Sequence, residues 1–284
     1  LANPKAGSRT LRKPLEDLVS QLRFRGLQPS LCWEREALPD HVKKANGSLR
    51  CVVAAGGDGT FQEVLNRVPG LPISVFPLGN ENLLARHFHF LQSGQALAET
   101  IARDQIRKLD LGRVNGRYFS LMASAGFDAE VVRHVHAQRA GHVNKLSYVW
   151  PLCTALQHYS FPAIRIDIEE TGECLQGALA FVFNLPMYGL GIPIAKDARP
   201  DDGYLDLWVF KKPGVVALAR YLDLILRGRQ DHHPDIQHRL VKQIHLSSDR
   251  PVPLQMDGDA AGQLPATLEA VPGAMDLVVP KDDR

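Results

Sequence analysis

Hydrophobic positions in the first hundred residues alternate between helical spacing and short continuous runs. A first helix face recurs at Leu11, Leu15, Leu18, Val19 and Leu22. Residues 49–55 and 72–77 are largely apolar, as in parallel strands that are covered on both faces. Further helical patterns cover residues 61–68, 83–88 and 96–101. Strands that alternate with helices in this way predict a doubly wound parallel sheet.

Weaker patterns complete this half of the chain. Gly26 follows the first helix as a natural stop. Residues 29–34 predict a short strand, and residues 40–45 predict a short helix.

The pattern changes near Asp110, where alternation with a period of two replaces helical spacing. Asn115-Gly116 lies between two such runs and indicates a two-residue hairpin. Further strand patterns cover residues 164–169, 179–184, 205–209, 241–246, 252–256 and 275–279, and helical patterns cover residues 128–136 and 215–226. We therefore predict an α/β domain over residues 1–110 and a mostly β domain, with antiparallel strands, over residues 111–284.

Composition narrows the function classes. The 284 residues are 45% hydrophobic and carry a net charge of +2, which is too mild to argue for nucleic acid but does not repel an anionic nucleotide or membrane surface. Four widely spaced cysteines contain no CxxC pair, which argues against a zinc site and predicts a reducing, cytoplasmic setting. No apolar run approaches the length of a transmembrane helix. The chain begins at Leu1 without methionine and its first strand looks trimmed, so we expect a segment before Leu1.

The strongest local signal is the loop Gly56-Gly57-Asp58-Gly59-Thr60, between a strand pattern and a helical pattern. Glycines permit a close backbone approach that a Cβ would block, and a helix N-terminus suits phosphate. Thr60 can cap the helix or hydrogen-bond an anion, and Asp58 beside a phosphate implies a cation such as magnesium. A simple strand-to-helix turn capped by Thr60 explains the same residues.

Two more loops, residues 3–8 and 77–82, follow predicted parallel strands. Ligands in open α/β sheets bind beyond the carboxyl ends of the strands, so the three loops together predict a nucleotide crevice. Each loop alone is also explained as an ordinary turn.

The second half of the chain contributes carboxylates. Asp257-Gly258-Asp259 places two of them on one tight turn, where either could take a proton from an attacking hydroxyl. An Asp-Gly hairpin turn accounts for the same residues and is the interpretation that the pattern alone favours. Another group, suited to a hard cation or to a solvated loop, consists of Asp197, Asp201, Asp202 and Asp206. Asp110 lies between two leucines, so its side chain points to the opposite face of its strand.

These motifs resemble a known family. The segments that carry the resemblance are residues 3–7 (NPKAG), 56–66 (GGDGTFQEVLN), 77–86 (PLGNENLLAR), 109–131, 201–207 (DDGYLDL) and 256–259 (MDGD). They are similar, in order and through nearly the whole chain, to the catalytic domain shared by diacylglycerol and sphingosine kinases, and to bacterial soluble lipid kinases in particular. The GGDGT loop is shared with NAD kinases and alone does not separate the two.

The resemblance implies a nucleotide-binding α/β domain, a β-sandwich-like domain that receives the lipid, and an active site between them. It implies an ATP- and Mg²⁺-dependent kinase that phosphorylates a hydroxyl of a diacylglycerol or sphingoid-type lipid. With the three-loop crevice, it assigns nucleotide contacts to Asn3, Pro4, Lys5, Ala6, Gly7, Gly56, Gly57, Asp58, Gly59, Thr60, Glu63, Gly79, Asn80 and Asn82.

The resemblance also implies catalytic and metal-binding roles. Asp259 is our choice as proton acceptor, with Asp257 second, and Asp58 and Asp110 would organise magnesium, partly through water. Asp202 would hold a further, structural cation together with the backbone carbonyls of Arg199 and Tyr204.

One loop departs from the family pattern. Bacterial diacylglycerol kinases usually carry threonine and aspartate where this chain has Asn80 and Leu83, and leucine cannot hold a metal ion or its water. Sphingosine kinases also carry an apolar residue at that position. Two alternatives stay open: an NAD kinase-like enzyme with a soluble acceptor, and a nucleotide- or lipid-binding regulator without turnover, which Leu83 motivates.

The expected partners follow from the resemblance. They are a lipid substrate, no nucleic acid, and at most a peripheral contact with the inner face of the membrane, with a homodimer left open. No strongly basic amphipathic helix stands out for a membrane contact.

Overall fold

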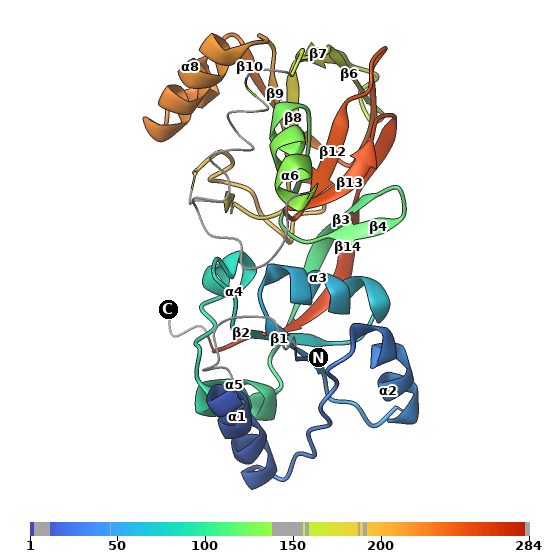
Figure 1. Ribbon diagram of the computed structural model, residues 1–284, viewed down its shortest axis with the longest axis vertical. Coiled ribbons are helices and arrows are strands. Elements are labelled where there is room, and N and C mark those ends of the chain that lie inside the picture. Colours follow the sequence, from blue (N-terminus) through green and yellow to red (C-terminus); the bar gives the residue numbers. More distant parts are fainter. Residues whose placement is uncertain are drawn as a thin grey trace. The chain divides into compact units, whose positions relative to one another are not determined.

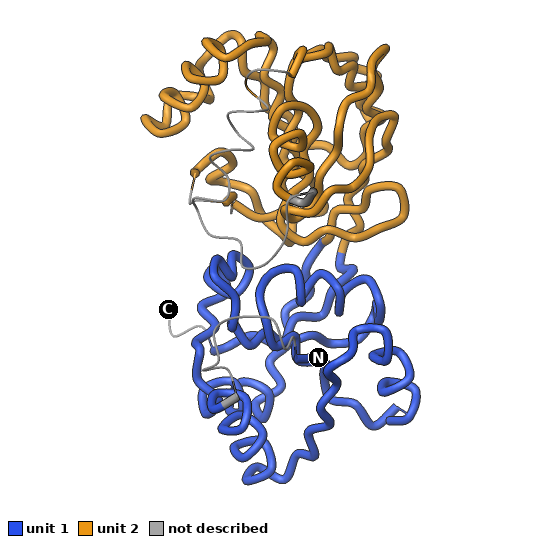
Figure 2. Tube along the Cα trace, viewed as in Figure 1, with its two compact units in different colours: residues 1–110, 273–284 blue, residues 111–272 orange. Residues whose placement is uncertain are grey.

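The chain folds into two compact units (Figures 1 and 2). The structure, a computed structural model, describes residues 1–2, 12–45, 47–137, 156, 159–186, 188–189 and 192–281. Unit 1 comprises residues 1–110 and 273–284, and unit 2 comprises residues 111–272. None of the helices in the described ranges is long and apolar enough to cross a membrane.

Unit 1 has the predicted alternation of helices and strands. Its elements before residue 104 are α1 (Arg12–Phe24), η2 (Arg35–Ala37), α2 (Leu38–Lys44), β1 (Val52–Gly56), α3 (Asp58–Arg67), β2 (Ile73–Pro77), α4 (Leu83–His87) and α5 (Gly94–Arg103). Strands β1 and β2 pair in parallel, and Ala2 extends the sheet beside Ala55, also in parallel. In Figure 1, α3 lies on one side of these strands and α1 with α5 lies on the other, so the predicted α/β architecture is confirmed.

Apolar side chains at the predicted spacing hold the helices in place. Leu15, Leu18 and Leu22 are buried on α1, which packs against α5. Gly94 begins α5 where a Cβ would lie 2.5 Å from the backbone nitrogen of Leu18, so this crossing requires glycine. Gly26 stops α1 in the left-handed region, as predicted.

The strand predicted over residues 29–34 is wrong. The segment is assigned no strand, although the amide of Ala2 donates to the carbonyl of Cys32 at 2.9 Å. Leu31 and Trp33 are exposed, so the segment runs along the surface rather than inside the sheet. Pro29 also lacks the N–H that a strand ladder needs.

Two long strands carry the chain from one unit to the other. They are β3 (Ile106–Val114) and β14 (Ala266–Val278). β14 pairs antiparallel with β11 (Gln243–Ser247) at its start and in parallel with β2 through Leu277 and Ile73 near its end. Because of this last pairing, residues 273–284 belong to unit 1, whereas the sequence places the whole of residues 111–284 in the second domain.

Unit 2 is built mainly of antiparallel strands. Its remaining elements are β4 (Arg117–Phe119), β5 (Met122–Ala125), α6 (Phe127–Ala137), β6 (Ile164–Ile168), β7 (Cys174–Gly177), β8 (Leu179–Phe183), β9 (Leu205–Phe210), α8 (Val215–Leu226), η5 (Gln230–His232), β10 (Ile236–Val241), β12 (Pro253–Met256) and β13 (Asp259–Gln263). One sheet has the order β10-β9-β8-β5-β12-β13, and the other contains β14-β11-β6-β7. Strands β7, β10 and β13 were not predicted from the sequence.

The core of unit 2 joins the two sheets. Ile166 and Leu246 from one sheet and Leu207 and Leu254 from the other belong to one buried cluster, as in a β-sandwich. The predicted hairpin at Asn115-Gly116 is confirmed: both residues have positive φ and join β3 to β4.

Candidate functional site

The glycine-rich loop joins β1 to α3 in unit 1. β1 ends at Gly56, Gly57 is the N-cap, and α3 begins at Asp58. Thr60 is buried in the first turn of α3, and the N-cap position that we predicted for Thr60 from the sequence is occupied by Gly57. Instead, Thr60 packs so closely on Gly56 that a Cβ there would lie 2.1 Å from its Oγ1.

The loop after β2 lies directly against this one. A Cβ on Gly79 would lie 2.5 Å from the Cα of Gly57, so the two backbones touch. Gly59 is different, because a Cβ there would meet no atom of the described part of the chain within 4 Å and its φ is not positive. Close packing therefore explains glycine at positions 57 and 79, whereas neither packing against the described residues nor a positive φ explains it at position 59.

Asp58 connects the two loops through its carboxylate. The amides of Leu83 and Leu84, in the first turn of α4, donate to Asp58 Oδ2 at 3.1 Å and Oδ1 at 3.4 Å. Burial raises the pKa of Asp58 and the charge of Glu81 adds to the rise, while the two amides act in the opposite direction. These hydrogen bonds leave further lone pairs on the carboxylate, since an ionised carboxylate can accept about four.

Asn82 shapes its own loop. Its side chain accepts from the amide of Gly79 at 3.0 Å and donates to the carbonyl of Gly79 at 2.7 Å. The residue itself has φ of 49° and is the N-cap of α4. The oxygen and the nitrogen of the Asn82 side-chain amide thus both bind the loop backbone. The other asparagine of this loop, Asn80, is exposed.

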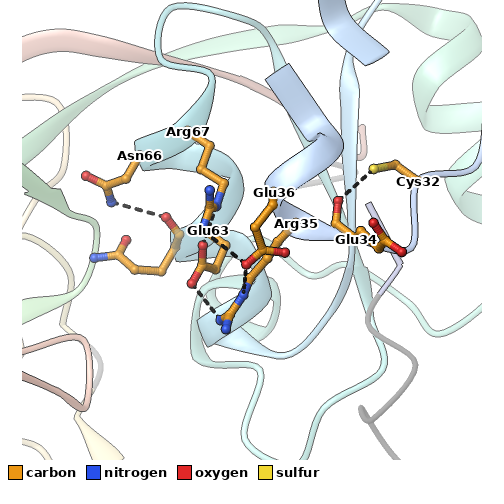
Figure 3. Close-up of polar contacts among 8 residues, drawn as sticks. Cys32, Glu34, Arg35, Glu36, Glu63, Asn66 and Arg67 are labelled. Carbon is orange, nitrogen blue, oxygen red and sulfur yellow. Dashed lines mark hydrogen bonds and ion pairs between the residues drawn. The ribbon is translucent and has the colours of Figure 1, made fainter. Parts of the chain in front are cut away.

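Glu63 lies in a group of ion pairs on α3 (Figure 3). Arg35 Nη1 lies 3.0 Å from one of its carboxylate oxygens, and Arg67 Nε lies 2.6 Å from the other. Glu36 also contacts both arginines. The sequence predicted Glu63 as a nucleotide contact but gave no sign of Arg35, which reaches it from η2.

Asp110 is the third acidic site residue of unit 1 that the sequence predicted. It is buried on β3, and its Oδ1 accepts from the amide of Gly273 at 2.7 Å. The predicted loop residues Asn3, Pro4, Lys5, Ala6 and Gly7 lie outside the described residues.

In unit 2, Asp257 and Gly258 form the hairpin turn between β12 and β13. Both have positive φ, and Met256 pairs with Asp259 across the turn. The predicted Asp-Gly hairpin is therefore confirmed as a structure. Asp259 is partly buried at the start of β13.

The carboxylate of Asp257 is turned back onto the segment before β5. It accepts from the amides of Ser120 (2.8 Å), Leu121 (2.9 Å) and Met122 (3.0 Å) and from the hydroxyl of Ser120 (3.0 Å). Burial raises the pKa of Asp257 to about 6, although these amides act in the opposite direction. The side chain that shares the turn with Asp259 is thus a structural anchor.

A second anchor of the turn was missed by sequence reasoning. The Oε1 of Gln255 accepts from the amide of Gly258 at 3.0 Å, and its Nε2 donates to Ser124 at 2.9 Å and to Asp128 at 3.1 Å. Asp128 also accepts from the hydroxyls of Ser124 and Tyr188, and burial raises its pKa. The sequence contained one sign of this anchor: Gln255 is a polar residue between the apolar Leu254 and Met256, which are both buried.

The expected cation site around Asp202 is a compact loop. Asp202 Oδ1 accepts from the amide of Tyr204 at 3.0 Å, and Gly203 has φ of 79°. Of its acidic neighbours, Asp201 pairs with Arg199 and Asp206 pairs with His238 at 2.6 Å. Within the described ranges, no three His, Cys, Asp or Glu side chains are gathered as metal ligands.

Comparison with known proteins gives a consistent family assignment. Residues 1–114 match the model of the diacylglycerol kinase catalytic domain, and residues 121–279 match the YegS C-terminal NAD kinase beta sandwich-like domain. The chain belongs to the diacylglycerol kinase family. As a member of this family, it is a lipid kinase.

Relatives of the family match over the whole length of the chain. A diacylglycerol kinase of Staphylococcus saprophyticus is 27% identical, with 99% of this chain and 94% of the relative covered. The diacylglycerol kinase of Staphylococcus haemolyticus is 28% identical, with 99% and 87% covered. A crystal structure of a Bacillus anthracis str. Sterne diacylglycerol kinase shares the fold, with a TM-score of 0.72, 18% identity and 98% and 94% of the two chains covered.

The departure from the family pattern lies at the centre of the unit 1 site. Leu83 is buried, and its backbone amide, rather than a side-chain carboxylate, contacts Asp58. In this lipid kinase, Asp58 is thus the acidic group that joins the two glycine-containing loops.

Proposed function

We propose that this lipid kinase transfers the γ-phosphoryl group of ATP, with Mg²⁺, to a hydroxyl group of diacylglycerol or a sphingoid-type lipid. The relatives named diacylglycerol kinase support the acceptor class. The observation that carries the proposal is the glycine-rich loop before α3, with its unobstructed glycine at position 59 and the carboxylate of Asp58 next to it.

The nucleotide phosphates would bind at the N-terminus of α3. Unpaired N–H groups and the positive end of the helix dipole favour an anion there. Gly59 supports this assignment because no atom of the described residues lies within 4 Å of the place where its Cβ would be. Gly56, Gly57 and Gly79 would hold the two loops close enough for both to contact the nucleotide, and Asn82 would fix the second loop.

Magnesium fits the acidic groups of unit 1. In phosphoryl-transfer sites, Mg²⁺ is usually held by one or two carboxylates together with substrate phosphates and water, and not by an all-protein cage. Asp58 keeps acceptor capacity beyond its bonds to Leu83 and Leu84, and Asp110 would assist through water. When bound, the ion neutralises the charge that develops on the transferred phosphoryl group. Asp202, with the carbonyls of Arg199 and Tyr204, stays our proposed site for a structural cation.

Asp259 would accept the proton of the attacking hydroxyl. A general base needs lone pairs directed at the substrate, whereas those of Asp257 face a hydroxyl and three backbone amides. The bonds of Asp257 and Gln255 to the turn would fix the position of Asp259. Asp257 would therefore act as a positioning residue.

A transfer assay with γ-labelled ATP tests the proposal. It uses Mg²⁺, diacylglycerol and sphingosine in mixed micelles, and NAD as a parallel acceptor. We expect a labelled lipid product. Asp58→Ala should abolish this product, and Asp40→Asn, a matched variant at an exposed aspartate, should retain it. Labelled NADP without a labelled lipid would overturn the lipid acceptor.

The absence of the family aspartate at Leu83 favours one alternative, a regulator that binds nucleotide without turnover. ATP binding with no labelled product from any acceptor would establish it. Binding measured by calorimetry on the same preparation separates this outcome from a misfolded protein.

A further inference from the structure

Helix α8 of unit 2 exposes an apolar stripe. Its buried side chains, Tyr221 and Ile225, lie on one face. An exposed face next to the buried one carries Val215, Ala219, Leu222 and Leu226, which recur at the three- and four-residue spacing of one helix face, and Val216 is exposed farther around the helix. Val216 is 86% exposed and Leu226 is 64% exposed. Large apolar side chains gathered on one exposed face mark an interaction site more often than single ones do.

The helix is held firmly by its buried face. The ring of Tyr221 lies 5.0 Å from that of Phe210, between centroids, and its hydroxyl accepts from the amide of Lys212 at 2.8 Å. Ile225 is buried one turn further along. These contacts fix the rotation of the helix about its axis, so the apolar stripe stays on the outside. In Figure 1, α8 lies at the edge of unit 2.

The segment that contains the stripe is rich in basic residues. Between residues 211 and 229 there are five basic side chains, Lys211, Lys212, Arg220, Arg227 and Arg229, and one acidic side chain. That acid, Asp223, forms an ion pair with Arg227 at 2.7 Å. A helix with an apolar face and basic flanks matches the interface of a bilayer that contains anionic lipids.

We propose that α8 docks the enzyme on an anionic bilayer surface, with its apolar stripe among the acyl chains and its basic residues at the headgroups. The choice of a bilayer as partner rests on the lipid acceptor of the proposed function, because that acceptor resides in a membrane. A second copy of the chain fits less well: a two-fold contact would bring the same basic segment of each copy together.

Vesicle sedimentation with the full chain tests this proposal without any need for turnover. The vesicles contain phosphatidylcholine alone or phosphatidylcholine with phosphatidylglycerol. We expect binding to the anionic vesicles that weakens as salt is added. Leu222→Ser and Leu226→Ser should each lower the partition coefficient by about tenfold, and Arg220→Gln by about fivefold.

Leu240→Ser is the matched control, since Leu240 is an exposed leucine of the same unit on β10. It should bind vesicles as the unmodified chain does, and all variants should keep the unmodified thermal unfolding midpoint. Equal binding by the unmodified chain and the α8 variants would overturn the proposal. Light scattering that shows a dimer, converted to monomer by Leu222→Ser, would also overturn it in favour of a second copy. If the chain binds vesicles through α8 but labels no lipid, the proposed function is contradicted, whereas membrane docking through α8 is supported.

Discussion

Gly57 and Gly79 touch backbone to backbone, with only 2.5 Å between the Cα of Gly57 and the place where a Cβ of Gly79 would lie. The contact joins the loops that follow two neighbouring parallel strands. Gly79→Ala should therefore force the loops apart and lower the free energy of unfolding by about 2 kcal/mol. Urea unfolding followed by circular dichroism measures this change.

Gly59→Ala is the informative counterpart. Within the ranges that the structure describes, its Cβ would meet no atom within 4 Å, and alanine suits a helix better than glycine, so stability should stay the same or rise by about 0.5 kcal/mol. Affinity for ATP should nevertheless fall by about tenfold or more, because the methyl group would occupy the space of a phosphate. Calorimetric titration with ATP measures the affinity. Unchanged ATP affinity in this stable variant would contradict a phosphate site at the N-terminus of α3.

The two acids of the β12–β13 turn should respond differently to amide substitution. Asp259→Asn should lower kcat by about 10²–10⁴-fold and leave the unfolding midpoint unchanged, as expected for loss of a general base. Asp257→Asn should lower the free energy of unfolding by about 2 kcal/mol, since one amide oxygen replaces two carboxylate oxygens that face four donors. Steady-state kinetics and urea unfolding of both variants separate the roles. A large loss of kcat in Asp257→Asn at full stability would reverse our assignment.

The pKa of Asp257 predicts a pH dependence of stability. The folded value is raised to about 6 by burial, whereas an unfolded aspartate titrates near about 3.9. Between these values the folded chain keeps a proton that the unfolded chain releases. The contribution of Asp257 to the free energy of unfolding should therefore fall by about 2 kcal/mol as pH rises from about 4 to about 6.5.

Asp257→Asn serves as the reference for this measurement because it lacks the titrating group. Its stability relative to the unmodified chain should improve steadily across the same pH window. A constant difference between the two proteins would mean that the amides of Ser120, Leu121 and Met122 keep the carboxylate ionised throughout.

Leu83→Asp should introduce a second acidic group at a residue whose backbone amide contacts Asp58. Without magnesium, the buried charge and its repulsion of Asp58 should lower the free energy of unfolding by about 2 kcal/mol. Added Mg²⁺ should recover part of that loss and reduce the Mg²⁺ concentration needed for half-maximal turnover. Thermal unfolding with and without Mg²⁺ tests the first effect. Leu83→Asn, of the same shape without the charge, is the control, and an equal response to Mg²⁺ in both variants would contradict the metal assignment.

Much of the local structure followed from the sequence alone. The spacing of leucines on α1, the apolar runs of β1 and β2 and the Asn115-Gly116 turn each identified an element, because helical and strand periodicity and positive φ are local properties. The motifs at residues 56–60 and 256–259 pointed to the family before any fold was known. The family models confirm that assignment.

Helix α8 shows a limit of such patterns. Its sequence is apolar on most sides, which is typical of a core helix, yet the structure buries Tyr221 and Ile225 and exposes Val216 and Leu226. Burial depends on what packs against a helix, and no periodicity within the helix contains that information.

The sequence by itself determined most of the elements, the family and the set of acidic residues on which the proposed chemistry depends. Only the tertiary structure decided how those acids are used. Asp257 is bonded to Ser120, Leu121 and Met122, and Asp58 to the amides of Leu83 and Leu84, across separations of 135–137 and 25–26 residues. Backbone amides carry no side-chain signature, so a pattern of residue types cannot reveal which amides a carboxylate will meet once the chain has folded.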